Sequence, residues 1–105
     1  MIAKTTQPPY YAVIFTSVRT PVDEGYAEMA YKMEELAQKQ PGFLGLESAR
    51  NEIGITVSYW ESLDAVKAWK NNLDHREAQL LGKQKWYKSY KVRIAKVEWE
   101  YDFEL

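Results

Sequence analysis

"FLGLESARNEIGITVSYW", residues 43–60, contains two runs of strand-forming sequence on either side of a short turn. Asn51 favours a turn, and residues 54–60 are rich in the β-branched and aromatic side chains that favour strands. Two such runs joined by a few residues predict a β-hairpin. The centre of the chain is therefore expected to form two antiparallel strands, residues 43–50 and 54–60.

A strand and a helix are expected before this hairpin. Residues 10–18, YYAVIFTSV, are an apolar run typical of a strand buried on both faces. Thr20 and Pro21 then favour a helix start, as the N-cap and the first helical residue. Apolar residues recur at spacings of three and four up to Ala37, and Pro41-Gly42 ends the pattern.

A second helix and a last strand are expected after the hairpin. Ser62 can cap this helix. Its apolar side chains share one face: Leu63, Val66, Trp69 and Leu73. A strand is expected over residues 91–101, where the apolar alternation changes phase near Ile94 and predicts a β-bulge.

The order strand, helix, strand, strand, helix, strand is that of the ferredoxin-like α+β fold. We therefore expect a βαββαβ domain whose four-stranded antiparallel sheet carries its helices on one face. Three of the strands look apolar on both faces, yet two helices cover only one. A second copy of the chain is expected to cover the other face by two-fold symmetry, which predicts a homodimer.

Length and composition exclude several classes of function. The 105 residues predict a single domain, with its core over about residues 10–101. Fourteen Lys and Arg against fifteen Asp and Glu give a net charge of −1, so neither nucleic acid nor a membrane surface is expected as partner. Without cysteine and with one histidine, no protein-held metal is expected. No signal-peptide run or long apolar span is present, which predicts a cytoplasmic protein.

The single histidine, His75, follows a possible break in the second helix. Asn71 and Asn72 disfavour a helix interior, while Asp74 and Glu77 resemble an N-cap with its capping-box partner. At the first position of a new helix, the positive end of the dipole would keep the imidazole neutral and able to move a proton. The alternative is that His75 is an exposed residue at a helix junction.

Three aromatic residues surround this histidine in sequence. Trp69 precedes it, and Trp86 and Tyr87 come about three helical turns after it in an otherwise polar segment. Aromatic residues at helical spacing usually belong to the core. They can also form the flat walls of a site for a planar aromatic ligand, and both interpretations stay open.

The chain contains the pattern W-K-x-x-x-x-H-x-x-A-Q…W-Y-x-x-Y, formed by Trp69, Lys70, His75, Ala78, Gln79, Trp86, Tyr87 and Tyr90. With the strand order, this pattern resembles the antibiotic biosynthesis monooxygenase family, and most closely a subgroup of small uncharacterised bacterial proteins. The likeness runs from about Tyr10 to Tyr101. It implies a dimeric α+β barrel in which two sheets pack face to face.

The resemblance also implies an activity. The family includes cofactor-independent oxygenases that oxidise phenols to quinones, quinol monooxygenases and haem-degrading monooxygenases. It implies a cofactor-independent monooxygenase that acts on a small phenolic or quinol substrate, with neither cofactor nor metal. Trp69 matches the helix tryptophan of the family, and His75 would be the general base. The remaining residues expected to line the substrate site are Trp86, Tyr87, Trp60 and Phe15.

Two other functions remain open. The first is a non-catalytic dimeric module for ligand binding or stress response, whose site holds a planar metabolite without reaction. The second is haem binding or degradation, which ranks last. The haem-degrading members place an iron-ligating histidine about ten residues after the helix tryptophan, where this chain has Gln79, and they have an asparagine in the first strand that residues 10–18 lack.

Overall fold

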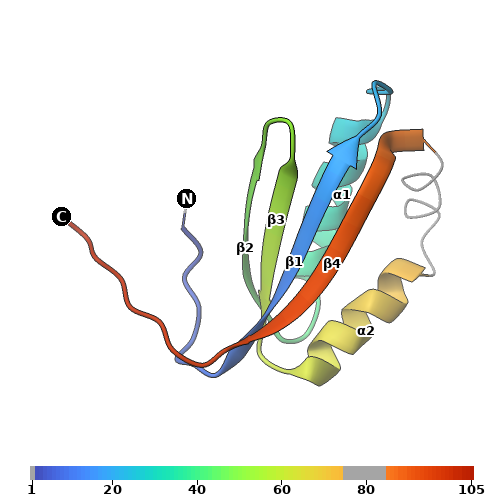
Figure 1. Cartoon of the computed structure of the whole chain (residues 1–105). Helices are drawn as coiled ribbons and strands as arrows, with labels where there is room; N and C mark the ends of the chain where they lie inside the picture. Colours follow the sequence, from blue (N-terminus) through green and yellow to red (C-terminus); the bar gives the residue numbers. More distant parts are fainter. Residues whose placement is uncertain (1, 75–84) are drawn as a thin grey trace.

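A four-stranded antiparallel sheet forms one layer of the protein and two helices form the other (Figure 1). The computed structural model describes residues 2–74 and 85–105. The strands lie in the order β2-β3-β1-β4, which confirms the ferredoxin-like βαββαβ fold. The elements are β1 (Tyr10–Arg19), α1 (Tyr26–Gln38), β2 (Phe43–Arg50), β3 (Gly54–Trp60), α2 (Leu63–Asp74) and β4 (Tyr87–Val97).

The register of β1 decides which side chains face the helices. Tyr11 pairs with Trp60 on β3 and with Lys96 on β4, and the pairing continues to Ser17, opposite Gly54 and Tyr90. Since side chains alternate across a sheet, the odd-numbered residues of β1 share the helix-facing side with Trp60. The even-numbered residues of β1 lie on the open face.

The core between the sheet and the helices is built around two stacked indoles. Trp60 is fully buried and stacks on Trp69, with ring centres 5.6 Å apart and ring planes 26° apart. Its Nε1 donates a hydrogen bond of 2.9 Å to the Ser58 hydroxyl, so the buried indole donor of Trp60 is paired. Val66 and Ala37 complete this buried cluster from the two helices. At the start of α2, the Ser62 hydroxyl accepts from the Ala65 N–H at 3.1 Å, which confirms the expected cap.

The first helix begins later than its sequence predicts. Thr20 and Pro21 favour a start there, but α1 begins at Tyr26 after Gly25, whose φ of 80° is left-handed. The Thr20 hydroxyl accepts from the Val22 N–H at 3.3 Å, as the cap prediction requires, but the helix does not follow until Tyr26. The same hydroxyl donates to the Lys85 carbonyl at 2.6 Å, which ties the end of β1 to the residues just before β4.

The last strand also differs from the expectation. β4 covers Tyr87–Val97 instead of residues 91–101, so Tyr87 lies in a strand and not in a helical segment. No bulge occurs at Ile94, which pairs regularly with Val13, and the register shifts instead beside Arg19. The change of apolar phase has another cause. Ile94 shares the helix-facing side with Val13, whereas Val97 lies on the open face opposite the buried Tyr10.

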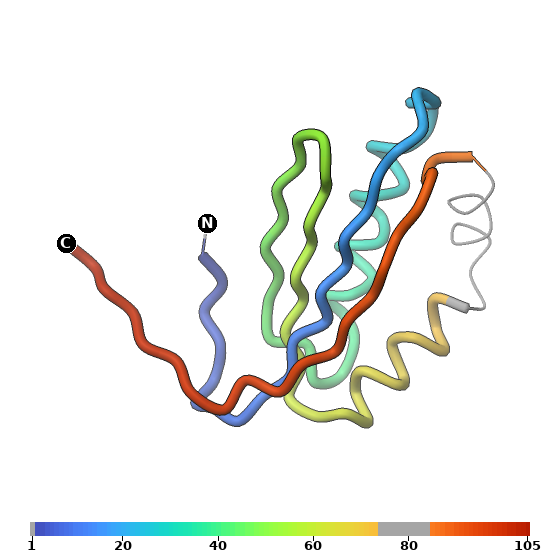
Figure 2. The backbone as a smooth tube through the Cα atoms, in the orientation of Figure 1, coloured from blue at the N-terminus to red at the C-terminus, as the bar shows by residue number. Residues whose placement is uncertain are grey.

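Both terminal segments leave the sheet on the side away from α2 (Figures 1 and 2). The N-terminal segment is tied to the open face, because the Glu47 carboxylate accepts from the Ala3 N–H at 2.9 Å and from the Tyr59 hydroxyl at 2.6 Å. The C-terminal arm, residues 98–105, is tied to β1 by a hydrogen bond from the Tyr10 hydroxyl to the Glu100 carboxylate.

Neither of the helices described above is long and apolar enough to cross a membrane. The cytoplasmic location and the single domain over residues 1–105 stay predictions.

Candidate functional site

The residues expected from the sequence to form a site fall into two groups. Trp60 and Trp69 form the stacked pair in the core, with 0% and 9% of their surfaces exposed. Phe15, Trp86 and Tyr87 belong to a second group of rings at the other end of the helix-facing side. His75, the expected general base, lies outside the described residues.

The second group is an aromatic cluster of five rings whose centres lie 5.3 to 6.1 Å from their neighbours. Its members come from β1, the first turn of α1, and β4 with the residue before it: Phe15, Tyr26, Trp86, Tyr87 and Tyr90. Four of its five ring pairs meet edge to face, a geometry that adds to the stability from burial. The strand pairing explains the gathering, because Tyr90 on β4 lies opposite Ser17, two residues along β1 from Phe15.

Trp86 has a structural place in this cluster. Its ring is 5% exposed, and its Nε1 donates to the Glu24 carbonyl at 3.0 Å. A side chain at Gly25 would meet the ring at 3.4 Å, and the left-handed φ of Gly25 also favours glycine. Trp86 therefore anchors the turn that starts α1.

Tyr87 supplies the most perturbed hydroxyl of the cluster. Burial raises the pKa of Tyr87 above its ordinary value, and the hydrogen bond with Tyr26 raises it further, whereas nearby Arg50 and Arg19 act in the opposite direction. The phenol is therefore protonated at neutral pH, and since its one O–H is engaged by Tyr26, its oxygen can accept a hydrogen bond from a ligand hydroxyl. Only the deprotonated phenolate could act as a base, and the raised pKa keeps the phenol protonated at neutral pH.

Two arginines that the sequence analysis did not single out reach the same cluster. The Arg19 guanidinium lies 3.5 Å from the centre of the Tyr26 ring, and that of Arg50 lies 6.0 Å from it. Arg50 reaches from β2 across Gly54 on β3 and donates to the Ser17 hydroxyl on β1. The only local signal was a basic residue at the end of each of two predicted strands.

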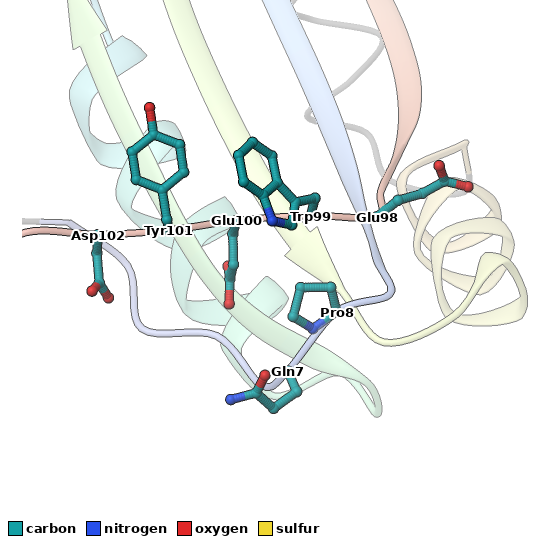
Figure 3. A pocket seen from close by; sticks show the side chains of 7 residues that line it. All are labelled: Gln7, Pro8, Glu98, Trp99, Glu100, Tyr101 and Asp102. Carbon is teal, nitrogen blue, oxygen red and sulfur yellow. The ribbon is translucent and has the colours of Figure 1, made fainter.

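A separate hollow of about 430 Å³ lies between the two terminal segments (Figure 3). Its walls are Gln7, Pro8, Glu98, Trp99, Glu100, Tyr101 and Asp102. Trp99 and Tyr101 project to one side of the arm, with ring centres 5.2 Å apart, and Glu100 and Asp102 project to the other. Within residues 2–74 and 85–105, no group of three acidic or histidine side chains could hold a metal ion.

Comparison with known proteins places this fold in a family. The sequence model of the antibiotic biosynthesis monooxygenases matches residues 9–80. The uncharacterised protein YqjZ of Bacillus subtilis is 52% identical over 99 residues, which cover 92% of this chain and 87% of that protein.

Solved structures agree on the fold. SnoaB, a cofactor-independent oxygenase from Streptomyces nogalater, matches with a TM-score of 0.68 at 9% identity, over 89% of this chain and 97% of that chain. NE2512 from Nitrosomonas europaea, of unknown function, matches with a TM-score of 0.68 at 11% identity, over 91% and 96% of the two chains. Likeness at these identities shows the fold alone. With the family match over most of its length, the chain belongs to the antibiotic biosynthesis monooxygenase family.

Proposed function

We propose that the protein is a homodimeric, cofactor-independent monooxygenase that oxidises a small phenolic or quinol substrate. The observation that carries the proposal is the aromatic cluster on the helix-facing side of the sheet, in a chain of the monooxygenase family. Its rings offer edges and faces to a planar substrate, and the oxygen of the protonated Tyr87 hydroxyl can accept from a substrate hydroxyl.

The proposed reaction needs a base and dioxygen. Removal of the phenolic proton makes the ring electron-rich enough to react with O₂ at a C–H position. One oxygen atom becomes the new carbonyl of a quinone, and the other leaves as water with the two hydrogens lost from the substrate. His75, the residue after Asp74 in the sequence, is proposed as this base, since imidazole is the side chain whose ordinary titration range lies near neutral pH.

Trp69 is connected to the aromatic cluster through packing in the core. Val13 packs against the stacked Trp60–Trp69 pair and precedes Phe15 by two residues on the same side of β1. The stacked pair is thus joined along β1 to the aromatic cluster. Trp69 is proposed to stabilise the substrate ring during its oxidation, and Trp60 to hold Trp69 in place.

Oxygen uptake tests this function. The purified protein is mixed with a panel of hydroquinones and polycyclic phenols in the presence of a metal chelator, with autoxidation subtracted. We expect uptake that His75→Ala lowers by about 10²- to 10⁴-fold, as removal of a general base does. Tyr87→Phe, which keeps the ring, is expected to weaken substrate binding more than turnover. No uptake by the folded protein would overturn the proposal, and uptake unchanged in His75→Ala would remove that residue from it.

A non-catalytic ligand-binding module is the second candidate. It is favoured by the polar groups of the cluster itself, which are tyrosine hydroxyls and guanidinium groups. Such groups hold a ligand near neutral pH without exchanging protons with it. This function predicts binding of the same phenols without consumption of oxygen.

The homodimer is proposed from the side of the sheet that the helices leave open. Ile55 on this face is 45% exposed, and the C-terminal arm carries four exposed apolar side chains: Trp99, Tyr101, Phe103 and Leu105. Exposed apolar side chains on an uncovered sheet face and on the arm beside it support a site of association. A second copy, related by two-fold symmetry, would cover both the face and the arm.

A further inference from the structure

Two arginines from different strands meet at one tyrosine ring. Arg19 ends β1 and Arg50 ends β2, and both guanidinium carbons lie within 6.0 Å of the centre of the Tyr26 ring. β1 and β2 end at the edge of the sheet where α1 and β4 begin (Figure 1). Both positive charges therefore lie around the Tyr26 ring on the helix-facing side, beside the aromatic cluster.

The acids near this pair of arginines do not neutralise both positive charges. Arg19 forms an ion pair with Asp23 at 3.1 Å, but the Asp23 side chain is 86% exposed. Across the part of the chain that the structure describes, no acid forms an ion pair with Arg50, and the buried Nε of Arg19 has no hydrogen-bond partner. A buried donor without a partner destabilises the fold unless a ligand or water accepts from it.

The fold holds Arg50 in place before any ligand arrives. Its Nη2 donates to the hydroxyl of Ser17, which is 1% exposed, so a buried group on β1 fixes a side chain from β2. Gly54, on the strand between them, leaves room for the Arg50 guanidinium because it has no side chain. A methyl group at Gly54 would overlap the guanidinium. A side chain fixed in advance loses less conformational entropy on binding.

We propose that Arg19 and Arg50 bind the carboxylate of an aromatic acid whose ring lies against Phe15 and Tyr87. Guanidinium groups match the two oxygens of a carboxylate through paired hydrogen bonds. The adjacent rings provide flat apolar surface for the rest of the ligand. This deepens the proposed function, on which it rests for the ligand being a substrate but not for the binding itself.

Calorimetric titration of the full chain with a matched pair of probes tests the site. The acid 2-naphthoate and the neutral 2-naphthamide have the same ring and nearly the same shape. We expect 2-naphthoate to bind about tenfold to a hundredfold more tightly, the range for hydrogen bonds to a charged group. Equal affinity for the two probes would overturn the proposal.

Three variants locate the binding. Arg50→Gln is expected to reduce the affinity for 2-naphthoate toward that for 2-naphthamide, with Arg19 keeping part of the preference. Gly54→Ala keeps both arginines but displaces the Arg50 guanidinium, so it should weaken 2-naphthoate binding without changing the charge. Lys67→Gln, which removes one exposed positive charge from α2, is the control and should leave both affinities unchanged. Equal losses in Lys67→Gln and Arg50→Gln would show a general charge effect and overturn the proposal.

The two proposals fail in different ways. Binding of 2-naphthoate that depends on Arg50, with no oxygen uptake on any phenol, would leave this site intact and overturn the oxygenase function. Oxygen uptake on neutral phenols, with no preference for 2-naphthoate, would leave the function intact and overturn this site. Thermal unfolding of each variant confirms that the measured protein is folded.

Discussion

Trp69 on α2 stacks on the fully buried Trp60 at the end of β3, with their ring centres 5.6 Å apart. This contact joins the second helix to the sheet at its most buried point. It also gives Trp69 two interpretations that substitution can separate, one as a core residue and one as a residue of the reaction.

Substitution of Trp69 tests its part in stability. Trp69→Ala removes a buried indole and leaves a cavity against Trp60, so we expect the free energy of unfolding to fall by about 3–5 kcal/mol. Trp69→Phe keeps a stacked ring and should lower it by less. Urea unfolding followed by circular dichroism measures both changes. A loss below about 1 kcal/mol in Trp69→Ala would show that the stacked pair contributes little.

The same two variants separate structure from catalysis. If Trp69→Phe remains folded yet loses oxygen uptake, the indole itself acts in the reaction. If uptake falls only in proportion to the unfolded fraction, Trp69 is a core residue.

Glu47 is expected to make the stability depend on acid pH. The hydrogen bond from Tyr59 lowers the pKa of Glu47 below its ordinary value, and the Ala3 N–H lowers it further. Because the folded-state pKa is the lower one, this stabilisation is present above about pH 4.5 and is lost as the pH falls through the folded-state value.

Urea midpoints at neutral pH and at about pH 3 measure this effect. In Glu47→Gln, which keeps one acceptor oxygen, the difference between the two midpoints should be smaller than in the native chain. Glu52→Gln, in the exposed turn between β2 and β3, is the control and should leave the difference unchanged. An unchanged difference in Glu47→Gln would contradict the assignment.

Tyr87 is expected to make the stability of the fold depend on alkaline pH. Burial and the hydrogen bond with Tyr26 raise the pKa of Tyr87, so the stabilisation is complete below about pH 10 and is lost as the pH rises toward the folded-state value. Burial and the hydrogen bond with Glu47 also raise the pKa of Tyr59, so Tyr59 contributes to the same loss of stability at alkaline pH.

The alkaline loss of stability should therefore be smaller in Tyr87→Phe than in the native chain. Urea midpoints at about pH 8 and pH 11 measure it. Tyr31→Phe, an exposed tyrosine on α1, is the matched control. Equal alkaline losses in Tyr87→Phe and Tyr31→Phe would show that the Tyr87 phenol is not buried in solution.

Features set by neighbouring residues could be predicted from the sequence. The hairpin over residues 43–60 and the Ser62 cap both depend on signals within a few positions, and both are confirmed. The start of α1 could not be predicted in this way. Thr20 carries a good cap signal and its hydroxyl accepts from the Val22 N–H, yet α1 starts only after Gly25, and the same hydroxyl donates to the Lys85 carbonyl, 65 residues further along the chain.

The arginine pair escaped prediction for a similar reason. Arg50 reaches Ser17 only because β2, β3 and β1 pair in a register that places Gly54 between them. No local pattern encodes a contact across three strands. The aromatic residues Phe15 and Tyr87 were expected at a site from the sequence, but the contact of Tyr87 with Tyr26 depends on where α1 begins.

The C-terminal arm gives the last prediction. From Trp99 to Leu105 its apolar side chains alternate with acidic ones and are 78% to 111% exposed, and Trp99 and Tyr101 project together to one side (Figure 3). If a second copy covers them, Trp99→Ser with Tyr101→Ser should weaken dimerisation by at least about tenfold, since buried interface tryptophans commonly contribute about 2 kcal/mol or more.

Sedimentation equilibrium should then show a mass shifted from two chains toward one. Tyr31→Ser, on the exposed side of α1, is the control and should leave the mass unchanged. A native chain that sediments as a monomer at every concentration would contradict the proposed dimer, because the arm would then remain exposed to water.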